Sequence, residues 1–282
     1  HVRRRLPGVI HQRDGELRSR GSQMPCGFDV QVTDQSALEV SPAERQAEFE
    51  RRWQHGGLPF LGCYSDLLFS KEANETAAEF IRGKIREIVK DPEVAALLTP
   101  TANDVVGCKR LCSDTGYFET FNRPNVTLVD VRSAPIEAIT PKGLRTAKRE
   151  YAFDDLILAT GFDAMTGSLV RIDIRGVGGA TLVERWAEGP RTYLGLSTVG
   201  FPNFFMMTGP GSPSVLSNMV VSIEQHAEWI ADCIAHLRAR GLSRMEATPE
   251  AQATWVAHVN EVADSTLLER TDDPHLLLRR DT

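Results

Sequence analysis

The sequence predicts an α/β protein, in which helices cover a parallel sheet. Residues 156–159 (Leu-Ile-Leu-Ala) form an apolar run that ends on Thr160 and Gly161. Residues 201–207 form a second run, which ends on another glycine turn. Apolar runs of this kind are typical of strands buried on both faces of a parallel sheet. Ligands bind beyond the carboxyl ends of such strands, so these two turns mark the expected site.

Composition narrows the class of protein. The 282 residues suffice for one large domain or two ordinary ones, and 41% hydrophobic with 25% charged residues is typical of a soluble globular protein. A net charge of −6 gives no reason to expect nucleic acid or an anionic membrane as a partner. No apolar stretch approaches the roughly 20 residues that span a bilayer. Five irregularly spaced cysteines fit a reducing compartment, so a cytoplasmic location is expected.

The first half of the chain is expected to be mainly helical. Ser41, Pro42 and Glu44 form a capping box with proline at the first helical position, which predicts a helix start. A second helix is predicted from apolar residues spaced by three and four between Ala77 and Val89, and Asp91 is expected to cap a third.

The second half is expected to alternate between strands and helices. Residues 126–131 are rich in β-branched side chains, and a hairpin is predicted to turn at residues 141–143. The glycines of residues 176–179 are interpreted as a turn, because the third glycine of the Gly-x-Gly-x-x-Gly nucleotide-binding pattern and a preceding buried strand are missing. A long helix is predicted from about residue 215 to 240, with Gly241 as its stop, and Thr248 opens another.

Two segments could carry chemistry. Residues 209–214 (Gly-Pro-Gly-Ser-Pro-Ser) precede the long helix, whose amino end favours a phosphate or an electron-rich carbonyl. The alternative is a routine helix start with Ser212 as the N-cap. Lys109 and Arg110 could bind an oxyanion or a phosphate, and the alternative is a surface pair at an element boundary. His226 and His258 are interpreted as surface or hydrogen-bonded histidines, and no metal site is expected.

Several segments, taken in order, resemble one known family. They are residues 73–77 (Ala-Asn-Glu-Thr-Ala), 109–110, 114–117 (Asp-Thr-Gly-Tyr), 151–167, 189–195 (Gly-Pro-Arg-Thr-Tyr-Leu-Gly), 201–203, 209–219 and 222–226. Across about residues 26–268 the chain resembles the Baeyer–Villiger monooxygenases of the phenylacetone and cyclohexanone type. The resemblance implies an FAD- and NADPH-dependent enzyme that inserts one oxygen atom of O2 beside a ketone carbonyl, via a C4a-peroxyflavin, to give an ester or lactone.

The resemblance also implies roles for individual residues. Arg110 matches the active-site arginine of the family, and Lys109 matches the neighbouring lysine that contacts NADPH. A further match implies a loop that lines the substrate pocket, formed by Ser214, Val215 and Leu216. Another implies residues that close around the flavin: Thr160, Gly161, Asp163, Asn218 and Met219.

The chain also departs from the family pattern. No Gly-x-Gly-x-x-Gly/Ala fingerprint occurs, although the family carries two, and its Phe-x-Gly-x-x-x-His-x-x-x-Trp-Pro signature is absent. We therefore expect the carboxyl-terminal portion of an incomplete flavoprotein with two dinucleotide-binding, Rossmann-like domains and a helical insertion. The expected segments are a disordered or artefactual stretch 1–25, the insertion 26–104, the end of the NADPH domain 105–158, part of the FAD domain 159–268, and an irregular tail 269–282.

Two alternatives stay open. The chain could be a non-catalytic fragment without tight flavin binding, because the phosphate-binding glycine loops are missing. The parent enzyme could instead oxygenate nitrogen or sulfur centres.

Overall fold

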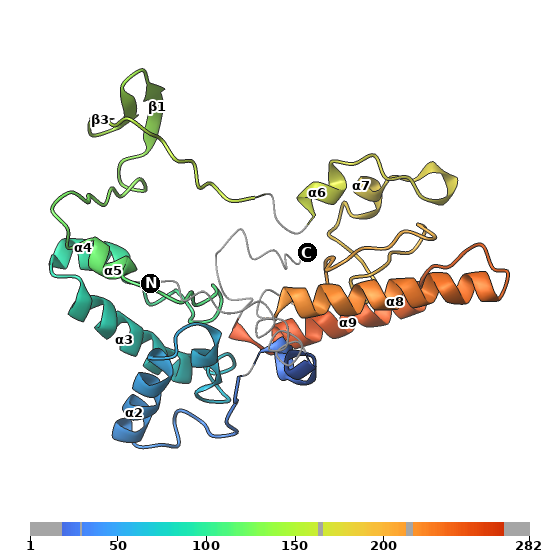
Figure 1. Ribbon diagram of the computed structural model, residues 1–282, viewed down its shortest axis with the longest axis horizontal. Helices are drawn as coiled ribbons and strands as arrows, with labels where there is room; N and C mark the ends of the chain where they lie inside the picture. Colours follow the sequence, from blue (N-terminus) through green and yellow to red (C-terminus); the bar gives the residue numbers. More distant parts are fainter. Residues whose placement is uncertain (1–18, 29, 163–165, 213–216, 268–282) are drawn as a thin grey trace, which may run out of the picture. The chain divides into compact units, whose positions relative to one another are not determined.

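The computed structural model describes residues 19–28, 30–162, 166–212 and 217–267. These residues form helices and one small sheet (Figure 1). The α-helices are α2 (Pro42–Trp53), α3 (Lys71–Ile88), α4 (Pro92–Leu98), α5 (Tyr117–Thr120), α6 (Gly167–Val170), α7 (Leu182–Arg185), α8 (Met219–Ala239) and α9 (Pro249–Asp264). The 3-10 helices are η1 (Pro25–Gly27), η2 (Leu58–Gly62) and η3 (Val177–Gly179). The strands are β1 (Ile136–Thr140), β2 (Gly143–Thr146) and β3 (Glu150–Ala152).

The chain divides into two compact units. Residues 1–77, 105–113 and 163–282 belong to the first unit, and residues 78–104 and 114–162 belong to the second. Chain segments far apart in sequence therefore build the first unit, which holds α2 and α6 to α9.

Local capping determines where the predicted helices begin. The Ser41 hydroxyl accepts a hydrogen bond from the Glu44 amide, and the Glu44 carboxylate accepts one from the Ser41 amide, so the predicted capping box is confirmed. These bonds lower the pKa of Glu44, led by the Ser41 side chain. Asp91 caps α4 and Thr248 caps α9, as expected. Gly241 ends the α8 region with a φ of +65°, in the left-handed region that favours glycine.

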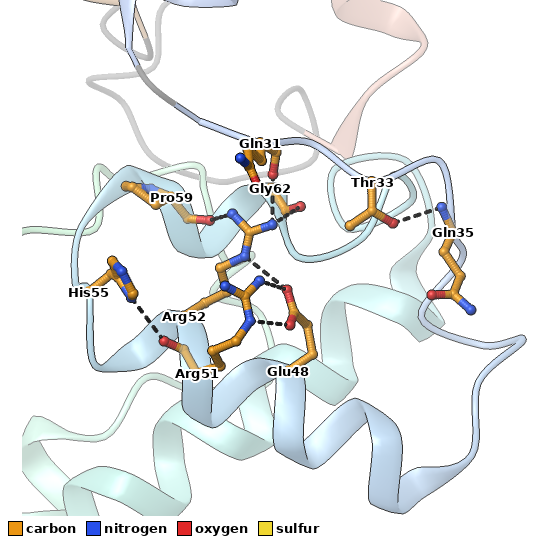
Figure 2. Close-up of polar contacts among 9 residues, drawn as sticks. All are labelled: Gln31, Thr33, Gln35, Glu48, Arg51, Arg52, His55, Pro59 and Gly62. Carbon is orange, nitrogen blue, oxygen red and sulfur yellow. Dashed lines mark hydrogen bonds and ion pairs between the residues drawn. The ribbon is translucent and has the colours of Figure 1, made fainter.

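A buried arginine ties α2 to the loops around it. Arg52 is only 6% exposed, and its guanidinium donates hydrogen bonds to the Glu48 carboxylate at 2.8 Å and the Gln31 carbonyl at 2.7 Å (Figure 2). It also donates to the carbonyls of Pro59 and Gly62, at 3.3 and 3.4 Å. A buried charge is tolerated only when it is paired and hydrogen-bonded, so this side chain is a fixed point of the first unit.

Aromatic and aliphatic packing completes the first unit. The ring of Phe49 stacks on Phe60 with centroids 5.4 Å apart and meets Tyr64 edge-on at 5.6 Å. A second core cluster contains buried residues of α7 and of the loop after it, namely Leu182, Trp186, Phe201 and Met206. Apolar side chains thus hold short helices and irregular loops together without a sheet.

The sheet of the described residues is small and antiparallel. Its strand order is β1-β2-β3, and Thr140 faces Gly143 across the predicted hairpin turn, which is confirmed. Gly143 faces Ala152 of β3, and a Cβ at Gly143 would lie 2.0 Å from the Tyr151 carbonyl oxygen. Only glycine fits at this close approach of two backbones.

The predicted buried strand at residues 156–159 is wrong. These residues form no strand, and Ile157 and Leu158 are 87% and 69% exposed. A strand needs neighbours to accept its backbone hydrogen bonds, and among the described residues the sheet ends at β3. The apolar pattern is genuine, but the described chain supplies no partner that could bury it.

Two other expected strands are also wrong. Residues 126–131 adopt irregular structure, as do residues 201–207, although Phe201 and Met206 are buried. The glycine stretch at 176–179 is a turn, as predicted, and it contains η3. Phe201 and Met206 are buried although no neighbouring strand pairs with residues 201–207, because an apolar run indicates burial more directly than it indicates strand pairing.

The long helix begins later than expected. Its N-cap is Asn218, whose side chain accepts from the Val220 amide, so the alternative of Ser212 as N-cap is wrong. Asn and Ser serve equally well as N-caps, and sequence alone did not distinguish them.

We predict that Arg52→Ala lowers the free energy of unfolding by roughly 2–4 kcal/mol, because it leaves buried carbonyl groups without a donor. Chemical denaturation of the purified chain measures this change. Arg51→Ala is the matched control, because Arg51 bonds the same carboxylate from a position 55% exposed, and we expect a loss below about 1 kcal/mol. Equal losses in the two variants would contradict this assignment.

Candidate functional site

Three segments of the first unit meet around Arg110. The Asn218 amide donates to the Cys26 carbonyl at 2.7 Å, and the Asn218 side chain donates to the Gly27 carbonyl at 3.2 Å. The guanidinium of Arg110 donates to the Ser217 carbonyl at 3.3 Å. These bonds join residues 26–28, Arg110 and residues 217–218, and we call this group the arginine site.

Backbone geometry at residues 26 and 27 makes this meeting possible. Cys26 and Gly27 both have positive φ, 59° and 69°. A Cβ at Gly27 would lie 2.9 Å from the Asn218 Cβ, closer than real Cβ contacts allow. Glycine is therefore required at this position for both its conformation and its size.

The arginine site is electropositive. Asn218 is the N-cap of α8, a helix of 21 residues, so the positive end of the helix dipole lies at this point. Arg110 is exposed and carries a full positive charge beside Ser217, the residue preceding that cap. A guanidinium next to a helix amino end can stabilise negative charge on an oxygen atom.

The turn at residues 209–212 is held by side chains from distant segments. The Thr192 hydroxyl donates to the Pro210 carbonyl at 2.6 Å, and the Trp255 indole N–H donates to the Gly211 carbonyl at 3.0 Å. Gly211 has a φ of +74°. α9 thereby fixes the described end of the segment that leads toward α8.

His226 fixes the beginning of the same turn. Its Nδ1 accepts a hydrogen bond from the Thr208 amide at 3.0 Å, and Thr208 has an unusual φ of +51°. The imidazole is 3% exposed, and burial lowers its pKa below the usual 6.5. The expectation of a hydrogen-bonded histidine is therefore confirmed, and the bond requires its neutral form.

The predicted site residues fall into three groups. Arg110 and Asn218 meet in the arginine site; Met219 is the first residue of α8, and Lys109 is exposed beside Arg110. Thr160 and Gly161 lie in the exposed apolar stretch of the second unit. The remaining predicted residues, Asp163, Ser214, Val215 and Leu216, lie outside the described residues.

The structure adds Phe28 and Ser217 to the residues that the sequence predicts for this site. The ring of Phe28 lies 5.6 Å from Arg110 Cζ, and Ser217 contributes only its backbone carbonyl. No sequence pattern marks a backbone acceptor. Gly27, next to Phe28, is the one sequence feature that could have indicated this contact, because glycine often marks a close approach of the backbone.

The described residues fit one part of a flavin site. The exposed guanidinium at the amino end of α8 suits an oxygen atom that is, or becomes, negatively charged. They do not fit a dinucleotide pyrophosphate, because the sequence has no glycine fingerprint to bring backbone N–H groups to it. The described residues therefore suit the reacting side of such a site better than its phosphate-binding side.

A cavity elsewhere in the first unit contains none of the predicted site residues. It measures about 470 Å³ beside α2, and Arg51, Arg52 and Cys63 are among its lining residues. Burial raises the pKa of the Cys63 thiol to about 12, so this thiol stays protonated at neutral pH. Three of the charged residues that line the cavity, Glu48, Arg51 and Arg52, already pair with one another.

Comparison with known proteins places the chain. No family model matches it. The chain is 44% identical over 248 residues to a Baeyer-Villiger monooxygenase of Pseudooceanicola batsensis, which covers 87% of this chain and 45% of the relative. Over this matched half, the chain belongs to the Baeyer–Villiger monooxygenase family. It is also 42% identical to the phenazine N-monooxygenase PhzNO1 of Lysobacter antibioticus, over 89% of this chain and 46% of that protein.

Solved structures agree with this Baeyer–Villiger assignment. A steroid monooxygenase bound to NADP superimposes with a TM-score of 0.87 at 49% identity, covering 94% of this chain and 51% of that one. The OTEMO complex with FAD and NADP has a TM-score of 0.87 at 40% identity, covering 94% and 50%. These neighbours confirm the predicted fold class, an α/β portion of a two-dinucleotide-binding flavoprotein. The chain spans about half the length of the curated relatives it matches.

Among the residues that the structure describes, no helix combines the length and the apolar character that a membrane span requires.

We predict that acid weakens the chain through His226. Its folded pKa is below the unfolded value, so its contribution to stability is complete above pH 6.5 and is lost as the pH falls below that value. His226→Gln, which keeps an acceptor, should flatten the fall in unfolding free energy between pH 7 and pH 5. His236→Gln, on the same helix, should leave the wild-type slope, and an unchanged slope in His226→Gln would refute the assignment.

Proposed function

We propose that this chain supplies the arginine-bearing half of an FAD- and NADPH-dependent Baeyer–Villiger monooxygenase. The reaction converts a ketone, O2, NADPH and a proton into an ester or lactone, NADP⁺ and water. Bound FAD supplies the oxygen-transfer chemistry, and NADPH supplies the reducing electrons. The solved OTEMO relative, a complex with FAD and NADP, supports this proposal.

One observation carries the proposal. The Arg110 guanidinium is exposed and lies at the positive end of α8, held by the Ser217 carbonyl. Nucleophilic addition to a ketone moves negative charge onto the carbonyl oxygen, and a preorganised donor lowers the barrier to that step. Arg110 acts as this donor, and its planar fork also orients the oxygen that accepts its hydrogen bonds.

The other residues of the proposal bind rather than react. Lys109 is exposed beside Arg110, which suits contact with the phosphate-bearing side of NADPH. Asn218 and Met219 form the amino end of α8 and contact the flavin, together with Thr160, Gly161 and Asp163. Ser214, Val215 and Leu216 line the substrate pocket. For the whole enzyme we retain the proposed segments: the helical insertion 26–104, the end of the NADPH domain 105–158 and part of the FAD domain 159–268.

The partners we propose are a small-molecule ketone and O2, with no role for nucleic acid or a membrane. A cytoplasmic location accompanies this proposal. Its support is that no disulfide joins any of the five cysteines, Cys26, Cys63, Cys108, Cys112 and Cys233.

A second candidate is oxygenation at nitrogen. The 42% identity to a phenazine N-monooxygenase favours it specifically. Attack by a nitrogen lone pair places no negative charge on a carbonyl oxygen, so Arg110 would contribute less to the barrier. The two candidates are therefore separated by how strongly the rate depends on Arg110.

A third possibility is that this chain by itself binds no flavin. The expressed chain is desalted after incubation with FAD, and its visible absorbance is recorded. Because the pyrophosphate loops are missing, we expect a colourless protein from the chain alone. We expect a yellow protein when the residues of the steroid monooxygenase that lie outside the match are fused to it. A colourless fusion would contradict the proposed half-enzyme.

We predict that Arg110→Ala in this fusion lowers kcat for lactone formation by roughly 10²- to 10³-fold, the usual effect of removing one oxyanion donor. Flavin absorbance should remain, because Arg110 does not hold the cofactor's phosphates. Gas chromatography of the product from cyclohexanone measures the change.

Arg238→Ala is the matched control, since Arg238 is also exposed and lies at the far end of α8. Lactone formation that survives Arg110→Ala would refute the role of Arg110. Loss of flavin absorbance in this variant would refute it equally, because it would make Arg110 a cofactor-binding residue.

A further inference from the structure

We propose that Phe28 is a positioning residue that sets the plane of the Arg110 guanidinium through a cation–π contact. This inference rests on the proposed function for the role of Arg110. The arrangement itself rests on contacts within the first unit of the structure.

The contact is direct. Arg110 Cζ lies over the Phe28 ring, 5.6 Å from its centroid, within the range of a cation–π interaction. Phe28 is partly buried and Arg110 is exposed. The ring therefore lies against one side of the guanidinium, and the exposed remainder of the guanidinium can contact a ligand.

The backbone that carries Phe28 is fixed independently of Arg110. Asn218 bonds the carbonyls of Cys26 and Gly27, the two residues just before the ring. The same Asn218 caps α8, so the ring and the helix end keep a constant relation. The ring thus belongs to the same rigid group as the helix end.

Arg110 needs this second contact. An exposed arginine has a long side chain with several freely rotating bonds, and the hydrogen bond to the Ser217 carbonyl fixes one nitrogen at 3.3 Å. One hydrogen bond leaves the guanidinium free to rotate about that nitrogen. Contact with the Phe28 ring, over which Arg110 Cζ lies, restricts this rotation, so the remaining donors point in one direction before substrate arrives.

Nuclear magnetic resonance of the whole chain tests the contact without any cofactor. An aromatic ring shifts protons that lie over its face upfield, so the Arg110 side-chain N–H signal, assigned by its loss in Arg110→Lys, should lie upfield. Phe28→Leu should move this signal downfield, and Phe28→Tyr should leave it upfield. An Arg110 signal unchanged in Phe28→Leu would overturn the inference.

Kinetics of the fusion described above test the consequence. Phe28→Leu should lower kcat by about two- to five-fold with KM unchanged, as expected for loss of an exposed cation–π contact that acts in the transition state, and Phe28→Tyr should restore it. A raised KM with unchanged kcat would make Phe28 a wall of the substrate pocket and overturn the positioning role. If the fusion makes no product at all, the proposed function fails while the magnetic resonance result still decides the contact.

Discussion

The bonds that Asn218 makes to the backbone of Cys26 and Gly27 are the constraint on which the rest of the site depends. The bond from the Asn218 side chain to the Gly27 carbonyl joins residues 191 positions apart, so it holds together distant segments of the first unit. It also sets the first turn of α8, because the same side chain accepts from the Val220 amide. Arg110 and Phe28, both earlier in the sequence, then lie at this helix end.

Charge placement follows from this constraint. The positive end of the α8 dipole lies at the Asn218 cap, and Arg110 adds a full positive charge next to it. The cation is held by a backbone carbonyl and a ring rather than by a carboxylate, so its charge is not neutralised within the described contacts. A site for developing negative charge requires this arrangement, whereas the buried Arg52, paired with Glu48, serves stability.

The parts of the fold that depend on local sequence were predictable. Ser41, Asp91 and Thr248 each cap the helix that follows, because a cap needs only the next few residues. The absence of a strand at residues 156–159 was not predictable, since strand formation depends on partners that the described residues do not include. Arg110 was identified by resemblance. Phe28 could not be predicted, because no sequence pattern indicates that an aromatic residue will contact a side chain distant from it in the sequence. Capping by Asn218 instead of Ser212 shows the same limit at short range.

The proposed role of Arg110 depends on where its guanidinium lies when the enzyme is complete. A crystal structure of the fused protein with FAD and NADP measures this directly. We expect one guanidinium nitrogen to stay near 3.3 Å from the Ser217 carbonyl and Cζ to stay over the Phe28 ring, with the other nitrogens facing the flavin ring. An Arg110 side chain that leaves Ser217 and points away from the flavin would contradict it.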